Sequence, residues 1–155
     1  MKLNLQDSES VAEHSYMMSV MAMVMADLKN LNTEKILKMT ILHDWAESKI
    51  GDFMPDEITI EKKTELEEYA MTELLDELPP AIKDNYFDIW NDYKENLSNE
   101  ARFVHELDKL EMALQGKIYE KETDPEKIKP FLISAVEKIA DDELKKILIE
   151  ILEKK

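Results

Sequence analysis

The chain has 155 residues, two glycines, no cysteine and a formal net charge of −15 at pH 7. This charge argues against general binding of nucleic-acid polymers, because a duplex would meet a repulsive field, and the lack of cysteine excludes disulfides and thiolate metal sites. The length suits one domain with one core, over residues 1–155, and the abundance of helix-forming residues predicts an all-α bundle of six or seven helices.

The first predicted helix begins after Ser10, which forms a capping-box pattern with Glu13. It continues to about Leu28 with apolar residues on nearly every side, so we expect it to be central in the fold. The longest apolar stretch, Val20 to Ala26, is far shorter than the roughly 20 residues of a membrane span, and no basic segment precedes it. We therefore expect no signal peptide, no membrane association and a cytoplasmic location.

A second helix is predicted to begin at Thr33 and to stop before Gly51, because glycine suits a left-handed position after a last turn. The segment 51–55 is then an ordered loop. A third helix is predicted from about Ile60 to Leu78, where a proline pair ends it, and a shorter helix follows over residues 81–95.

Three more helices complete the predicted bundle. The first is capped by Ser98 or Asn99 and runs to about residue 120, and the others span about 125–139 and 141–152. The apolar residues of the last helix could form a dimer interface or could equally close the core of the monomer; they are Ile147, Leu148, Ile151 and Leu152.

His43 and Asp44 stand together near the end of the second predicted helix, on the side that otherwise carries apolar residues. Ionisable groups in such a place need a partner. Adjacent residues diverge by about 100° around a helix, but one ion between the two directions can accept both. Glu47 lies one turn further on the same side, beside the expected ion; its alternative is a surface ion pair with Lys49 or Lys38.

Two further polar residues lie on apolar stripes of other predicted helices. His14 is in the first helix, and its alternative is a core histidine hydrogen-bonded to a carbonyl group. Asp108 is in the helix 98–120, and its alternative is an ion pair with Lys109 or Arg102. With the histidine–aspartate pair they make a set of two imidazoles and two carboxylates. Such a set suits one divalent transition metal, Mn, Co, Zn, Fe or Ni, better than calcium.

Several stretches of the chain resemble the 5′-deoxynucleotidase branch of the HD-domain superfamily, over about residues 9–120. The main ones are Glu9-Ser10-Val11-Ala12-Glu13-His14-Ser15-Tyr16, His43-Asp44-Trp45-Ala46-Glu47 with Gly51-Asp52, and Leu107-Asp108-Lys109-Leu110-Glu111-Met112. The segments Trp90 to Arg102 and Gln115 to Tyr119 add to the resemblance.

The resemblance implies roles for individual residues. The metal ligands would be His14, His43, Asp44 and Asp108. Glu47 would be the catalytic glutamate, and Asp52 a carboxylate near the substrate sugar, with ordinary turn chemistry as the alternative for Asp52. His105 has no ligand role in this pattern, so we expect it to be structural or solvent-facing.

The resemblance also implies an activity, the hydrolysis of deoxynucleoside 5′-monophosphates to a deoxynucleoside and phosphate, and a homodimer. One alternative is an HD phosphohydrolase that acts on a triphosphate, a cyclic nucleotide or an alarmone. Another is a catalytically weak module that binds metal and nucleotide. We consider the second because family members usually carry an N-terminal helix with an Arg-Trp or Gly-Trp motif, and this chain begins just after that place.

Overall fold

The computed structural model describes residues 8–53 and 57–153, and over these residues the chain forms helices and no strand. Seven helices have ten residues or more, and α3 is a single turn. The prediction of an all-α bundle is therefore confirmed. The predicted loop 51–55 lies partly outside the described residues. The helices are α1 (Val11–Lys29), α2 (Thr33–Leu42), α3 (Glu47–Ile50), α4 (Ile60–Asp76), α5 (Pro80–Glu95), α6 (Asn99–Tyr119), α7 (Pro125–Lys138) and α8 (Asp142–Glu153).

The helices begin where local capping chemistry predicts. The Ser10 side chain accepts from the backbone N–H of Glu13, and the Glu13 carboxylate in return accepts from the backbone N–H of Ser10 at 2.8 Å. Ser98 caps α6, and Asp124 caps α7 immediately before a proline at the first helical position. These ends are determined by residues within four positions of each other, so the sequence was sufficient to place them.

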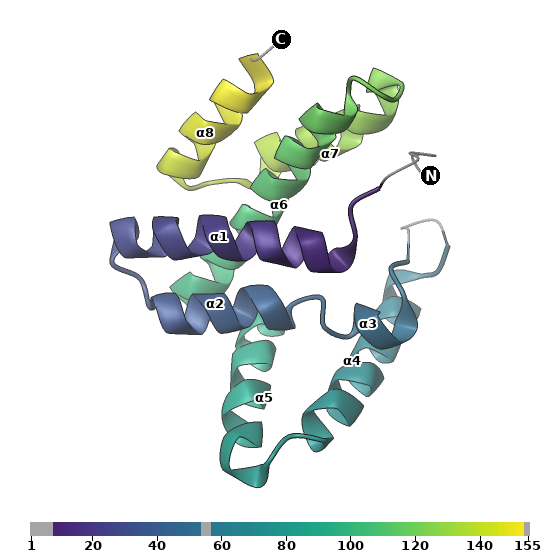
Figure 1. Cartoon of the computed structure of the whole chain (residues 1–155), viewed down its shortest axis with the longest axis vertical. Helices are drawn as coiled ribbons and strands as arrows, with labels where there is room; N and C mark the ends of the chain where they lie inside the picture. The colour runs from purple at the N-terminus through teal and green to yellow at the C-terminus, as the bar shows by residue number, and fades with distance from the viewer. Residues whose placement is uncertain (1–7, 54–56, 154–155) are drawn as a thin grey trace.

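Helix α6 is the centre of the molecule and packs against α1, α2, α5, α7 and α8. In Figure 1, α1 and α2 lie antiparallel across the face of α6, with α7 and α8 on one side of this pair and α4 and α5 on the other. The core between them includes Met18, Ile36, Met39, Leu107 and Leu110, all fully buried. The antiparallel pairing places the beginning of α1 beside the end of α2, and the candidate site forms there.

Helix α8 closes the core of the monomer. Leu148 and Ile151 are buried, and Ile147 and Leu152 pack partly buried against the same cluster. Of the two possibilities that the sequence left open for this apolar face, the structure shows packing within the monomer. None of the helices in the described part of the chain combines the length and the apolar character needed to cross a bilayer.

The prediction of one continuous helix from Thr33 to Gly51 is wrong, because α2 ends at Leu42. In the turns that follow, the backbone N–H of Glu47 bonds to the carbonyl of Asp44 at 3.0 Å, three residues back, and the helix resumes only as α3. This tightened turn redirects the chain just where the histidine–aspartate pair lies. Gly51 ends α3 with a φ of 82°, the positive value for which glycine was expected.

Candidate metal centre

Two histidine rings from different helices face each other at this end of the bundle. His14 comes from the first turns of α1 and His43 caps α2, and their ring centroids are 5.4 Å apart. Each ring is held by its Nδ1 atom: His14 Nδ1 lies 2.6 Å from Glu111 Oε2, and His43 Nδ1 lies 2.9 Å from the backbone oxygen of Thr40. The Nε2 atoms of both rings are therefore the nitrogens available to bind an ion.

The two predicted aspartates approach these Nε2 atoms. Asp44 Oδ2 is 3.0 Å from His43 Nε2 and 3.7 Å from His14 Nε2, while Asp108 Oδ1 is 3.5 Å from His14 Nε2. Ligand atoms of His14, His43 and Asp108 all lie within 4.8 Å of one another. Atoms bonded to one ion at about 2.0–2.2 Å lie up to about 4.4 Å apart, and the three contacts between the histidine nitrogens and the aspartate oxygens, at 3.0, 3.5 and 3.7 Å, are within this limit. The structure thus brings the four predicted residues, from three separate parts of the chain, into one cluster.

One buried atom provides a direct test of whether a cation fits this centre. His43 Nδ1 donates to a backbone carbonyl, so Nε2 of the neutral ring carries a lone pair. This Nε2 is buried, the side chain is only 2% exposed, and its nearest polar neighbour among the described residues is the Asp44 carboxylate at 3.0 Å. That carboxylate also presents lone pairs, so it repels the neutral ring unless a proton or a metal ion lies between them. Burial by itself lowers the pKa of His43, but the contact with Asp44 outweighs it and raises that pKa. The residues present therefore fit a divalent ion.

The electrostatics of the centre also favour positive charge. Burial by itself lowers the pKa of His14, but hydrogen bonds to Asp108 and Glu111 outweigh it and raise that pKa to about 10. Burial raises the pKa of Asp108, yet His14 and Lys109 together hold it well below its ordinary value. At neutral pH without an ion, His14 carries a proton beside ionised carboxylates. A metal ion bound there would take over this charge and release the proton.

Glu47 is the first residue of α3 and its side chain is only 8% exposed. Burial and the charge of Asp44 raise the pKa of Glu47 to about 7, although Lys63 acts in the opposite direction. The Glu47 carboxylate lies 3.3 Å from Lys63 Nζ, on α4. The alternative, a surface ion pair of Glu47 with Lys49 or Lys38, is therefore wrong: Lys49 pairs with Glu73 and Lys38 pairs with Glu34. A carboxylate with a pKa near neutrality is suited to accept a proton at neutral pH.

The other residues with expected roles lie around this centre. Asp52 is exposed just after Gly51, and its charge contributes to raising the pKa of Glu47. His105 is structural, as predicted: its Nε2 lies 2.9 Å from the backbone oxygen of Tyr93, and its ring stacks on the Tyr93 ring at 4.1 Å. Tyr93 in turn meets His43 edge-on at 5.7 Å.

Sequence reasoning missed Glu111. It is 1% exposed and lies on α6 three residues after Asp108, so both carboxylates point to the same side of the helix. That spacing was the available signal, but the partner of Glu111 is His14, 97 residues away in the chain.

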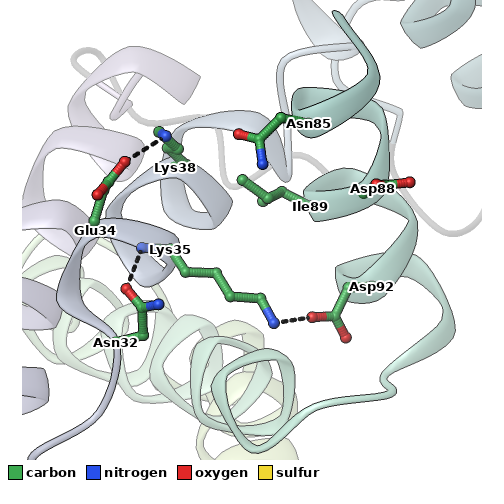
Figure 2. A pocket seen from close by; sticks show the side chains of 8 residues that line it. All are labelled: Asn32, Glu34, Lys35, Lys38, Asn85, Asp88, Ile89 and Asp92. Atoms are coloured by element: carbon green, nitrogen blue, oxygen red, sulfur yellow. Dashed lines mark hydrogen bonds and ion pairs between the residues drawn. The ribbon is translucent and has the colours of Figure 1, made fainter. Parts of the chain in front are cut away.

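A surface hollow of about 430 Å³ lies away from the candidate ligands, between α2 and α5 (Figure 2). Both of its lysines are neutralised: Lys35 Nζ is 2.6 Å from Asp92, and Lys38 Nζ is 2.6 Å from Glu34. Because these cations already have partners within the chain, we assign the hollow no role.

Comparisons with known proteins agree in the family they indicate. A model of the HD domain matches residues 1–151 of the chain. A mouse protein named 5′-deoxynucleotidase HDDC2 is 36% identical over 150 residues, which cover 96% of this chain and 75% of the mouse protein. The human protein of that name is 37% identical over 150 residues, covering 96% and 73%. The solved structure of PH0347 protein from Pyrococcus horikoshii OT3 is similar with a TM-score of 0.71 and 31% identity, covering 96% of this chain and 83% of that one.

Proposed function

This chain belongs to the HD-domain family, and on that premise we propose that it is a metal-dependent 5′-deoxynucleotidase, which hydrolyses deoxynucleoside 5′-monophosphates to a deoxynucleoside and phosphate. One observation carries the proposal: the buried Nε2 of His43 clusters with His14, Asp44 and Asp108, in a chain whose relatives from mouse, human and yeast are named 5′-deoxynucleotidases.

In the proposed site His14, His43, Asp44 and Asp108 hold one divalent transition metal. Two imidazole nitrogens and two carboxylate oxygens suit Mn, Co, Zn, Fe or Ni, and leave positions free for water and a phosphate oxygen. When bound, such an ion supplies Lewis acidity toward the phosphoryl group and toward water. The residues of the chain then have to position the nucleotide and move the protons.

Glu47 is proposed to accept the proton of the attacking water. The water oxygen forms a bond to phosphorus, the bond from phosphorus to the 5′ oxygen breaks, and the leaving 5′ oxygen takes up a proton to give the deoxynucleoside. The pKa of about 7 allows Glu47 to take and return a proton near neutral pH. Lys63 keeps the glutamate in place at 3.3 Å, and Asp52 is proposed to contact the sugar.

A product assay across nucleotide classes tests this function. With added Mn²⁺ or Co²⁺ we expect inorganic phosphate and deoxynucleoside from dAMP, dGMP and dCMP, and none after treatment with EDTA. Cleavage of triphosphates or cyclic nucleotides with monophosphates left intact would contradict the proposal and favour the related hydrolases. Metal and nucleotide binding without turnover would contradict it in favour of a binding module.

The proposal includes a homodimer, for which one face of α1 is the candidate interface. Tyr16, Val20, Val24 and Leu28 lie four positions apart, and Met23 lies beside them. These five apolar side chains are between 40% and 71% exposed. A helix that is apolar on all sides is normally buried on all sides. No charged residue occurs over positions 15–26, so two copies can meet here despite the net charge of −15.

Glutamate substitutions on this face should separate the proposed dimer. We expect the double variant Val20→Glu, Val24→Glu to be monomeric by light scattering, because an isologous interface would bring four new carboxylates together. The matched control is Ile60→Glu, an 83% exposed apolar residue on α4, which should leave the mass unchanged. A wild-type chain that stays monomeric at high concentration, or a double variant that stays dimeric, would exclude this interface.

A further inference from the structure

We propose that Glu111 is the positioning residue of the metal centre, which holds the Nδ1 proton of His14 and orients the ring so that the Nε2 lone pair faces the ion. The inference deepens the proposed function, since it rests on the same metal site. It assigns a role to a buried carboxylate that is neither one of the predicted metal ligands nor the proposed catalytic glutamate.

The geometry gives each nitrogen of His14 a different carboxylate from α6. Glu111 Oε2 lies 2.6 Å from Nδ1, and Asp108 Oδ1 lies 3.5 Å from Nε2. An ionised carboxylate can only accept a hydrogen bond, so the short contact holds a proton on Nδ1. The tautomer with a lone pair on Nε2 is therefore the one that the neutral ring adopts, and this lone pair points toward the proposed ligands.

The second histidine shows the same arrangement with a weaker partner. His43 Nδ1 donates to the backbone carbonyl of Thr40 at 2.9 Å, which also leaves Nε2 for the centre. A carboxylate partner carries a full charge, so it makes the imidazole of His14 a stronger electron donor than a carbonyl partner would. The two rings are thus oriented alike. The partner of His43 is a backbone carbonyl, whereas the partner of His14 is a side chain, which a substitution can remove.

The burial of Glu111 argues that it has a functional role. It is 1% exposed, and a buried carboxylate is costly unless it is paired. Among the ion pairs of the described residues, Glu111 pairs with His14 and with no lysine or arginine. An apolar residue of similar size would fill this position in α6 at lower cost, so packing alone does not account for the glutamate.

A second ion held by Glu9, His14 and Glu111 is the alternative, since their ligand atoms also lie within 4.8 Å of one another. The contact between His14 Nδ1 and Glu111 Oε2 is too short for this reading. Two atoms bound to one ion at right angles, with bonds of about 2.0–2.2 Å, are roughly 3 Å apart, whereas these are 2.6 Å apart. The distance is that of a direct hydrogen bond.

Titration of the metal-free protein with Co²⁺ tests the proposal, with visible absorption and chelator competition as readouts. Glu111→Ala should weaken Co²⁺ binding by about 10–100-fold and change the absorption spectrum of the bound ion, as expected when an outer partner of a ligating histidine is lost. Glu111→Gln keeps the size and an acceptor oxygen but loses the charge, so it should show a smaller loss. If the alanine variant does not fold, the glutamine variant carries the test by itself.

The control is Glu106→Gln, on the same helix. The Glu106 carboxylate accepts from the backbone N–H groups of Ala140 and Asp141 at 2.8 and 2.7 Å, so its loss affects stability without touching the metal centre. Thermal unfolding of each metal-free variant is measured in parallel. A merely structural role for Glu111 would lower the unfolding temperature and leave the Co²⁺ affinity and spectrum as in Glu106→Gln.

Two results would overturn the inference. One is wild-type Co²⁺ affinity and spectrum in both Glu111 variants. The other is binding of two equivalents of Co²⁺ per wild-type chain, with one of them lost in Glu111→Gln, which would indicate the second ion site. Hydrolysis of dAMP by the wild-type chain is followed separately. If the wild type releases no phosphate while the Glu111 variants lose Co²⁺ affinity, the proposed function fails and the role of Glu111 stands.

Discussion

Replacing Asp108 with alanine is expected to remove the bound metal and to reduce phosphate release from dAMP to the background of the metal-stripped protein. Asp108 is the carboxylate that α6 contributes, 3.5 Å from His14 Nε2, and no other described ion-pair contact brings an α6 carboxylate to that atom. Because Asp108 is a proposed direct ligand, its loss should weaken metal binding by more than the loss expected for an outer partner such as Glu111, which is about 10–100-fold. Elemental analysis after dialysis and a phosphate assay measure the two effects.

A matched control for this variant is Asp92→Ala. The Asp92 side chain is 13% exposed and paired with Lys35, while the Asp108 side chain is 14% exposed and paired with Lys109. Both substitutions remove a partly buried, ion-paired aspartate, but only Asp108 is near the two histidines. His43→Ala should behave like Asp108→Ala. Full metal content and full activity in Asp108→Ala and His43→Ala would show that the ion is held elsewhere.

Replacing Glu47 with glutamine should have a different outcome: the metal stays bound, and kcat for dAMP falls by about 10²–10⁴-fold, the usual contribution of a general base. Among the ion pairs of the described residues, the Glu47 carboxylate contacts Lys63, whereas Asp44 and Asp108 contact the two histidines. Glutamine preserves the size of the side chain but cannot accept a proton from water. Metal content and steady-state kinetics separate the two effects.

The pH dependence of the rate gives this prediction a second readout. Glu47 accepts a proton only when it is ionised, and its pKa is raised to about 7 by burial and by the charge of Asp44. A bound cation favours the ionised form and lowers this pKa. The wild-type kcat should therefore be constant at higher pH and fall as the pH drops through a value at or below about 7. The residual rate of Glu47→Gln should lose this decline on the acid side.

Glu67→Gln is the control for Glu47. Glu67 shares the same lysine, at 3.4 Å from Lys63 Nζ, but is not the proposed base. The Glu67→Gln variant should keep the wild-type rate and its fall at low pH. This result would separate the loss of the proposed base from the loss of a negative charge beside Lys63. A Glu47→Gln variant with wild-type kcat, or one that loses its metal, would show that Glu47 is not the base.

The sequence by itself determined most of the helices and most of their ends. Ser10 with Glu13, Ser98 before α6 and Asp124 before a proline are local signals, because a cap needs only residues within one helical turn. The side of a helix on which a polar residue lies is also local. This is why His14 and Asp108 could be selected as candidate ligands on apolar stripes, although their role as ligands stays a prediction.

The tertiary structure decided which of these sides meet. The break after Leu42, the pairing of Glu47 with Lys63, the contact of Glu111 with His14 and the packing of α8 into the core all depend on how the helices cross. The position of a residue along one helix specifies the direction in which its side chain leaves the helix axis. Which residue of another helix it then contacts depends on how the two helices pack around α6. That packing is the sum of many apolar contacts, and no short pattern of residues encodes it.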